Sequence, residues 1–311
     1  MTAPGVAVVV CTYRRPDGLA RLLAALPAVP VIVVDNDGAD PRVAAVVEDA
    51  RRRGSDIRLH VEPRPGFSAA RNRAFAEATA AGFGLVALLD DDEWPAAGWL
   101  AALLARREES GAVVVGGIVR PVFPPGAEAL ARHARFWSVL PQARQGRPFV
   151  HATSNVLIDL ACLADAPWPL FDEAFGLSGG GDTVFFAGLF RCGVRMAWAE
   201  AAVAFEEVPP ARASWRWITR RRVRAGNHMV LEERLRAGRL RPAAKTAGLC
   251  LRLAVYPLLG REPASLLAGW WLEAAKVWGR IAAHRGLTAV EYARDAAGDR
   301  PPRAKVARVR P

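Results

Sequence analysis

The stretch 85-LVALLDDDEWP-95 decides the fold, because it joins an apolar run directly to a cluster of acids. Residues 85–89 are all apolar, and Asp90, Asp91 and Asp92 follow without a break. Such a run, if it is a strand, is covered on both faces, as strands of parallel sheets are. Three carboxylates at its end repel one another, so we expect a positive group to lie beside them. A solvated turn is the alternative interpretation.

The same unit, a short apolar run followed by a helical stretch, occurs four times within residues 6–107. Strands that alternate with helices in this way form a mostly parallel sheet with helices on both faces. We therefore predict an α/β, Rossmann-like fold. The predicted strands are 6–10, 31–34, 57–61 and 85–89, each followed by a predicted helix at 19–26, 43–53, 69–81 and 99–107; further strands are predicted at 113–119 and 156–158, and a helix at 183–190.

Polar residues follow three of the predicted strands. Thr12 and Tyr13 come after the first, residues 35–37 after the second, and residues 90–92 after the fourth. Because parallel α/β sheets bind ligands at the carboxyl ends of their strands, these groups are expected to converge on one crevice. Mg²⁺ and Mn²⁺ take one or two carboxylates together with phosphate oxygens, so the aspartates suit a metal-bound nucleotide diphosphate.

Two further motifs carry polar residues at predicted helix starts. In 66-GFSAARNRA-74, Arg71 lies in the first turn, and a helix N-terminus beside a guanidinium is a favourable place for phosphate. In 179-GGGDTVFF-186, a glycine turn delivers Asp182 to a helix start, where a carboxylate can act as a general base. An ordinary capped helix remains the alternative for both motifs.

Basic residues gather at the C-terminal end. Of the 42 Lys and Arg, 22 lie in residues 208–311, which hold only 7 of the 31 Asp and Glu. A segment of this kind is typical of binding to nucleic acid, to an anionic membrane surface or to a phosphate-bearing ligand. A codon bias towards arginine would produce the same excess.

Residues 243–285 are the most apolar part of the chain. Charged residues interrupt them, so no uncharged stretch reaches the roughly 20 residues needed to span a bilayer. Within 264–284, a narrow polar stripe leaves the tryptophans on the other faces of the predicted helix. This pattern fits a helix that lies in a membrane interface, and equally an amphipathic helix packed on the rest of the protein.

The four cysteines lie far apart in different contexts and show no metal-ligand spacing, which is typical of reduced thiols. The first apolar run, 6–10, is too short for a signal peptide. We therefore expect a cytoplasmic protein, with peripheral contact to the inner face of the cytoplasmic membrane.

Five motifs in this order, VVVCTYRRP, VDND, GFSAARNRA, LLDDDEWP and GGGDTVFF, resemble the family 2 glycosyltransferases of the GT-A fold. The later stretch EEVPPARASWRWITRRRVRAGN is similar to bacterial exopolysaccharide-type members. The resemblance covers about residues 5–228. It implies a GT-A domain at 1–210, followed by a helical, basic and amphipathic region at 211–298; we expect a disordered tail at 299–311.

The resemblance also implies roles for single residues in binding the nucleotide-sugar. Thr12 and Asp35 would contact the nucleobase, with Tyr13 beside them, and Arg71 would contact the nucleotide. Asp90 and Asp92 would hold a divalent cation, Mg²⁺ or Mn²⁺, and the ribose-diphosphate, with Asp91 beside them in the nucleotide-sugar site; which carboxylate ligates the metal stays open.

The catalytic motif departs from the family pattern. Asp182 would fall at the aspartate of the family's Glu-Asp pair, but Gly181 takes the place of the glutamate. The assignment of the general base therefore rests on Asp182. The QxxRW signature of processive synthases is absent from the sequence, which favours the addition of a single sugar.

These implications predict an inverting, metal-dependent transferase that moves a sugar from an NDP-sugar, of UDP or GDP type, to an acceptor hydroxyl in cell-envelope glycan synthesis. The acceptor would be a glycan or a lipid-linked sugar, and we expect an anionic membrane but no nucleic acid among the partners. His151, Asn155, Arg221 and Arg224 are the candidate acceptor residues.

The sequence disfavours two other functions. A nucleic-acid-binding protein is disfavoured because the arginines show no repeating base-reading pattern. A nucleotidyltransferase is disfavoured because no glycine-rich, basic nucleotide loop follows the first strand.

Overall fold

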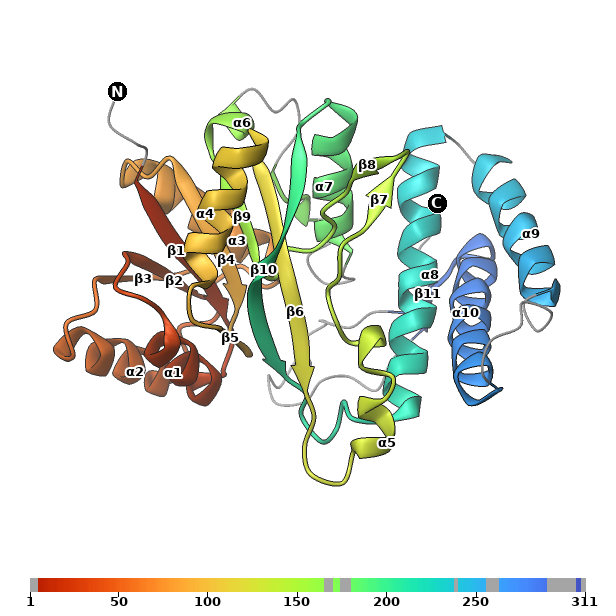
Figure 1. Cartoon of the computed structure of the whole chain (residues 1–311), viewed down its shortest axis with the longest axis horizontal. Coiled ribbons are helices and arrows are strands. Elements are labelled where there is room, and N and C mark those ends of the chain that lie inside the picture. The colour runs from red at the N-terminus through yellow and green to blue at the C-terminus, as the bar shows by residue number, and fades with distance from the viewer. Residues whose placement is uncertain are drawn as a thin grey trace. The chain divides into compact units, whose positions relative to one another are not determined.

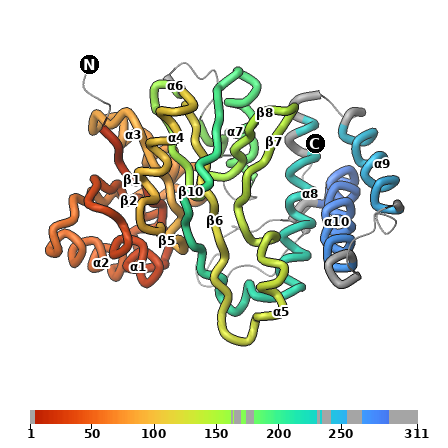
Figure 2. Tube along the Cα trace, viewed as in Figure 1, coloured from red at the N-terminus to blue at the C-terminus, as the bar shows by residue number. Residues whose placement is uncertain are grey.

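The computed structural model describes residues 5–164, 170–173, 180–237, 240–255, 263–289 and 306–308. The chain divides into two compact units (Figures 1 and 2). The first, here called the sheet unit, comprises Met1–Val122, Trp137–Leu177 and Gly181–Glu207. The second, the helical unit, comprises Phe123–Phe136, Ser178–Gly180 and Val208–Pro311.

The sheet unit is built on a mixed sheet with the strand order β3-β2-β1-β4-β9-β6-β10-β5. The first four strands in this order are parallel, whereas β9 is antiparallel to both of its neighbours and β5 is antiparallel to β10. The strands are β1 (Val6–Thr12), β2 (Val31–Asp35), β3 (Ile57–Val61), β4 (Leu85–Asp90), β5 (Glu93–Pro95), β6 (Val114–Val122), β9 (Val156–Asp159) and β10 (Met196–Glu207), with the short hairpin β7 (Ala143–Arg144) and β8 (Arg147–Pro148) beside them.

Alternate residues of the central strands enter two separate cores. Ala7 and Val9 of β1 pack with α3 and α7 on one face, and Val8 and Val10 pack with α1, α2 and α4 on the other. This two-sided burial is the reason for the uninterrupted apolar runs. The helices are α1 (Pro16–Ala25), α2 (Pro41–Arg52), α3 (Phe67–Ala80), α4 (Trp99–Ser110), α6 (Ala161–Ala164) and α7 (Gly181–Arg191), and they confirm the predicted alternation.

The predicted crevice edge is confirmed by the register of the strands. Thr12 at the end of β1 lies opposite Asp35 at the end of β2, and Cys11 lies opposite Asp90 at the end of β4. The polar residues that follow these strands are therefore brought to one edge of the sheet. Gly18 of α1 packs so closely against the turn after β4 that a methyl group there would overlap the carbonyl oxygen of Asp91.

The helical unit is held together by α8 (Trp215–Ala237), α9 (Leu240–Val255) and α10 (Pro263–His284). Helices α8 and α10 cross at two glycines, because a methyl group at Gly226 would overlap the carbonyl oxygen of Lys276, and one at Gly279 that of Val223. The amide of Asn227 donates a hydrogen bond to the Gly279 carbonyl at 2.5 Å. The short helix α5 (Glu128–Ala131) and a 3₁₀ turn, Ala134–Phe136, also belong to this unit.

A buried ion pair joins the same three helices. Arg280 of α10 is 1% exposed, and its guanidinium donates to Glu233 of α8 at 2.6 Å and to Thr246 of α9 at 3.0 Å. Because a buried guanidinium is costly unless it is paired and hydrogen-bonded, these contacts fix how the three helices pack.

Three residues of the tail that we expect to be disordered, 299–311, lie in a strand. Val306–Arg308 form strand β12, which pairs antiparallel with β11 (Leu287–Ala289), so here the tail finds backbone partners. The other residues of the tail lie outside the described ones. Within the described residues, no helix is long and apolar enough to cross a membrane.

The glycine crossing predicts a clear difference between two helical glycines. Gly226→Ala should lower the free energy of unfolding of the helical unit by about 1–3 kcal/mol or more, because the crossing leaves no space for a methyl group. Gly248→Ala in α9, where nothing lies near the added carbon, should raise it by up to about 1 kcal/mol. Urea unfolding followed by tryptophan fluorescence measures both changes; equal changes would contradict the close crossing.

Candidate active site

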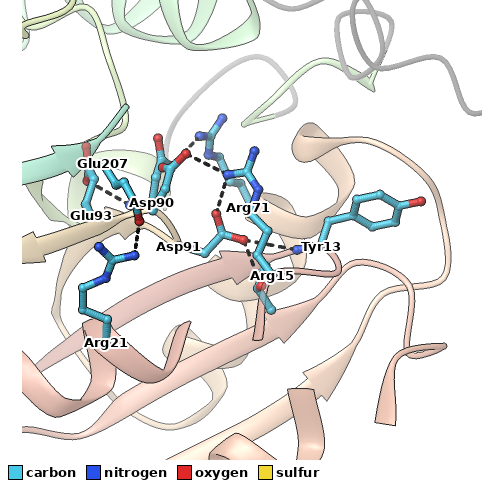
Figure 3. A network of polar contacts seen from close by, with 10 residues as sticks. Tyr13, Arg15, Arg21, Arg71, Asp90, Asp91, Glu93 and Glu207 are labelled. Carbon is cyan, nitrogen blue, oxygen red and sulfur yellow. Dashed lines mark hydrogen bonds and ion pairs between the residues drawn. The ribbon is translucent and has the colours of Figure 1, made fainter. Parts of the chain in front are cut away.

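The aspartate cluster is compensated by a cation from the loop after β1. One nitrogen of Arg15 donates to Asp91 at 2.9 Å and to Asp92 at 2.8 Å (Figure 3). The second oxygen of Asp91 accepts the hydroxyl of Thr12 at 2.9 Å and the backbone N–H of Tyr13 at 3.4 Å. Asp91 thus uses both oxygens within the protein and ties the turn after β4 to the end of β1.

Arg71 joins two carboxylates that lie far apart in the sequence. Its guanidinium donates to Asp182 at 2.8 Å and to Asp90 at 3.2 Å. The side chain is nearly buried and lies over the rings of Phe67, at 4.9 Å, and Phe171, at 5.7 Å. One fixed cation therefore holds the predicted base beside the predicted metal-binding carboxylate.

Local contacts explain how α3 presents Arg71. The side-chain oxygen of Asn36 accepts the N–H of Gly66, whose φ of 111° favours glycine, and this bond sets the start of the helix. One turn into α3, Asn72 exchanges two hydrogen bonds of 2.9 Å with the backbone of Phe171. The helix start is thereby fixed from both sides, and Arg71 with it.

Asp182 is held at both of its oxygens. It lies in the first turn of α7; Oδ1 accepts from Arg71, and Oδ2 accepts the hydroxyl of the buried Thr153 at 3.0 Å. The carboxylate is 27% exposed, so solvent still reaches it. This combination of a fixed orientation and an accessible surface suits a general base.

Crowding of carboxylates changes the acidity of the cluster. Removal from bulk water, together with the negative charges of Asp92, Asp182 and Asp91, raises the pKa of Asp90 to about 6, although Arg71 opposes the shift. Burial also raises the pKa of Glu93 well above its usual range, and its carboxyl group accepts the backbone N–H of Asp90 at 2.9 Å. Negative charge at this edge is only partly neutralised by the protein.

The end of β2 forms the other side of the site. Asp35 is buried, accepts the N–H of Asp37 at 3.2 Å, and has its pKa raised, mainly by burial. Next to it, Asn36 donates to the carbonyl oxygens of Glu62 and Arg64, at 2.9 and 2.6 Å. These bonds tie the loops after β2 and β3 together beside Asp35.

Arg15, Glu93 and Thr153 were missed by the sequence analysis. The sequence contained an indication for Arg15, because this cation stands shortly after the first predicted strand and the aspartates required a positive group. For Thr153 the sequence contained no indication, since nothing around it shows that it lies beside Asp182, 29 positions away.

The predicted acceptor residues do not all fit their role. Asn155 is fully buried, and its amide contacts the carbonyl oxygens of Ile118 and Ala202 and the indole N–H of Trp99, so its position does not support contact with an acceptor. His151 packs between the rings of Phe149 and Trp198. Arg221 and Arg224 lie on α8, in the helical unit, and stay predictions.

The residues present fit a divalent cation. Asp90 and Asp92 carry hard carboxylate oxygens and each also contacts one arginine, whereas both oxygens of Asp91 are used within the protein. No three His, Cys, Asp or Glu side chains of the described residues are arranged to hold a metal ion. Mg²⁺ is commonly held by one or two carboxylates and completed by substrate phosphates, which suits this donor set.

Comparison with known proteins gives a consistent result. Residues 7–156 match the model of glycosyl transferase family 2. The succinoglycan biosynthesis protein ExoM of Rhizobium meliloti (strain 1021) is 36% identical over 272 residues, which cover 81% of this chain and 85% of that protein.

Solved structures share the fold at lower identity. The mannosyltransferase PcManGT from Pyrobaculum calidifontis, in complex with GDP-Man and Mn²⁺, has a TM-score of 0.60 at 20% identity, covering 91% of this chain and 88% of that chain. S. aureus TarS 1-349, in complex with UDP-GlcNAc, has a TM-score of 0.51 at 14% identity, covering 91% of each chain. The fold is therefore the GT-A fold that the motifs predicted.

Proposed function

Since the chain belongs to glycosyl transferase family 2 and is a glycosyltransferase, we propose that it transfers a sugar from an NDP-sugar to an acceptor hydroxyl with inversion and with a divalent cation. The observation that carries this proposal is the shared guanidinium of Arg71, which holds Asp182 beside Asp90. A base and a diphosphate-binding carboxylate are thereby kept at one fixed separation, as an in-line displacement requires.

Asp182 is the proposed general base. Thr153 and Arg71 orient its carboxylate, which takes the proton of the acceptor hydroxyl as that oxygen attacks the anomeric carbon. The family's glutamate is replaced by Gly181, so the base function falls to this carboxylate alone within the motif.

Asp90 and Asp92 are the proposed residues for the cation and the diphosphate. A bound Mg²⁺ or Mn²⁺ would supply positive charge to the departing phosphates. Arg71 adds a fixed positive charge beside Asp90, and Arg15 keeps Asp91 and Asp92 in place. Thr12, Tyr13 and Asp35 are proposed to contact the nucleoside.

The donor class is proposed from the solved structures that share the fold of this chain. PcManGT and TarS are described with GDP-Man and UDP-GlcNAc, and both share the fold. We propose a UDP- or GDP-sugar donor on this support. The likeness to ExoM, a succinoglycan biosynthesis protein, supports an acceptor in glycan synthesis, either a glycan or a lipid-linked sugar.

Exchange of the proposed base tests the mechanism. Asp182→Asn keeps an acceptor oxygen for Arg71, and its amide N–H can donate to the hydroxyl of Thr153, but the basic group is removed, so kcat should fall about 10²- to 10⁴-fold while NDP affinity changes little. Glu200→Gln, an exposed change on β10, serves as the matched control. Turnover is measured as NDP release in the presence of acceptor; an unchanged kcat in the aspartate variant would exclude Asp182 as the base.

Calorimetric titration with UDP, GDP and dTDP separates the metal-binding residues from the nucleoside-binding ones. In Mn²⁺, Asp92→Ala should weaken binding of the preferred nucleotide at least about tenfold, with little effect in EDTA. Asp35→Asn should weaken binding in both conditions, because it acts on the nucleoside. If Mn²⁺ makes no difference to the parent protein, the metal-dependent proposal fails.

Peripheral contact with an anionic membrane is also proposed. Leu267 and Trp278 are 71% and 59% exposed, and their spacing of eleven residues, about three turns, places them on one face of α10. Exposed tryptophans in a basic segment are typical of interfacial helices.

Flotation with vesicles that contain anionic lipid tests this contact on the full chain. The double variant Leu267→Gln, Trp278→Gln should lose most of its vesicle binding, whereas Val61→Gln, an exposed apolar position in the sheet unit, should keep it. Equal flotation of the two variants would remove α10 from the proposed contact.

A further inference from the structure

A groove on the helical unit contains a set of residues that the proposed reaction does not use. It has a volume of about 660 Å³ and runs between the N-terminal part of α8 and the facing part of α10. This volume lies in the range of small-molecule sites. Its lining includes His133, Trp215, Arg216, Thr219, Arg220 and Trp271.

The two indoles that flank the groove are held in place although both are partly exposed. The indole N–H of Trp271 donates to the hydroxyl of Thr219 at 2.8 Å. The ring of Trp215 is packed edge-on by His133, with the ring centres 5.1 Å apart. Because the walls are fixed before any ligand arrives, little side-chain entropy is lost when a flat face binds to them. Indoles that are both fixed and 39–53% exposed suit stacking against a ligand.

The groove also contains two arginines whose guanidinium groups can bind a ligand. Arg216 and Arg220 lie one turn apart on the same face of α8, and neither guanidinium forms a hydrogen bond or an ion pair with any residue in the described ranges. Other arginines of this helix are engaged: Arg222 pairs with Glu273 at 2.6 Å, and Arg221 lies over the ring of Trp217 at 5.3 Å. Two guanidiniums one turn apart are a suitable pair for a phosphate or carboxylate group.

We propose that this groove is a saccharide-binding site, separate from the nucleotide-sugar crevice, for a hexose that carries an anionic group. The apolar face of the pyranose would stack on the indoles, and the anionic group would lie between Arg216 and Arg220. A surface that binds only anions would not require two fixed indoles, and a surface that binds only an apolar lipid tail would not require two arginines. The inference extends the proposed function, because such a site would hold the glycan on which the enzyme acts.

Titration of the full chain in EDTA tests the groove without turnover. Glucose 1-phosphate and glucuronate are the probes, with glucose and inorganic phosphate as the separate halves, and tryptophan fluorescence or calorimetry gives the affinity. We expect at least one anionic hexose to bind more tightly than either half. Arg220→Gln and Trp271→Leu should each weaken that binding at least about tenfold. Arg285→Gln and Leu251→Ala, exposed positions outside the lining, should leave it unchanged.

Several results would overturn the proposal. Binding of inorganic phosphate as tight as that of the anionic hexoses would show a simple anion patch. Displacement of the hexose by UDP or GDP would place it in the crevice instead. If Arg220→Gln and Trp271→Leu abolish vesicle flotation while no hexose binds to the parent chain, the surface belongs to a bilayer. Because neither Mn²⁺ nor a donor is present, failure here leaves the Asp182 and Asp92 tests intact, and failure of those tests leaves this one intact.

Discussion

Negative charge at the end of β4 is the constraint on which the site depends. Two carboxylates about 4 Å apart repel by roughly 4 kcal/mol at an effective dielectric constant near 20, and this turn carries three in a row. Cations from two different elements, Arg15 after β1 and Arg71 in α3, offset the repulsion. The ends of the strands, the start of α3 and the start of α7 therefore have to meet at one place, and the core on each face of the sheet fixes where that place is.

The two arginines offset the charge of the carboxylates only in part, and this indicates a functional site. The pKa of Asp90 is raised to about 6 even with Arg71 beside it, so the carboxylate edge retains affinity for a further positive charge. Perturbed acidity of this kind, produced by burial and like charges at a ligand edge, is characteristic of functional sites.

The parallel half of the fold and most of the crevice could be predicted because they rest on local patterns. Apolar runs of four or five residues mark β1, β2 and β4, and alternating apolar residues mark β3; topology then brings the residues after β1, β2 and β4 to one edge. Strand β10 gave no such signal, because MAWAEAAVAFEE is rich in alanine, which is uncommon in strands, and its pairing with β6 is a tertiary effect. Thr153 and the buried role of Asn155 were hidden for the same reason: each depends on chain segments that are distant in sequence.

The contacts of Asn155 limit which substitutions this part of the chain can accept. Asn155 has a φ of 51°, and its amide links β6, β10 and Trp99 of α4, while a methyl group on Gly117 would overlap that amide. A methyl group on Gly117 would also overlap the backbone carbonyl oxygen of Ala202, so position 117 has to stay glycine whatever residue stands at 155. An engineer who alters the loop between β8 and β9 therefore has to keep Asn155, whose amide links β6, β10 and α4, and has no freedom at Gly117.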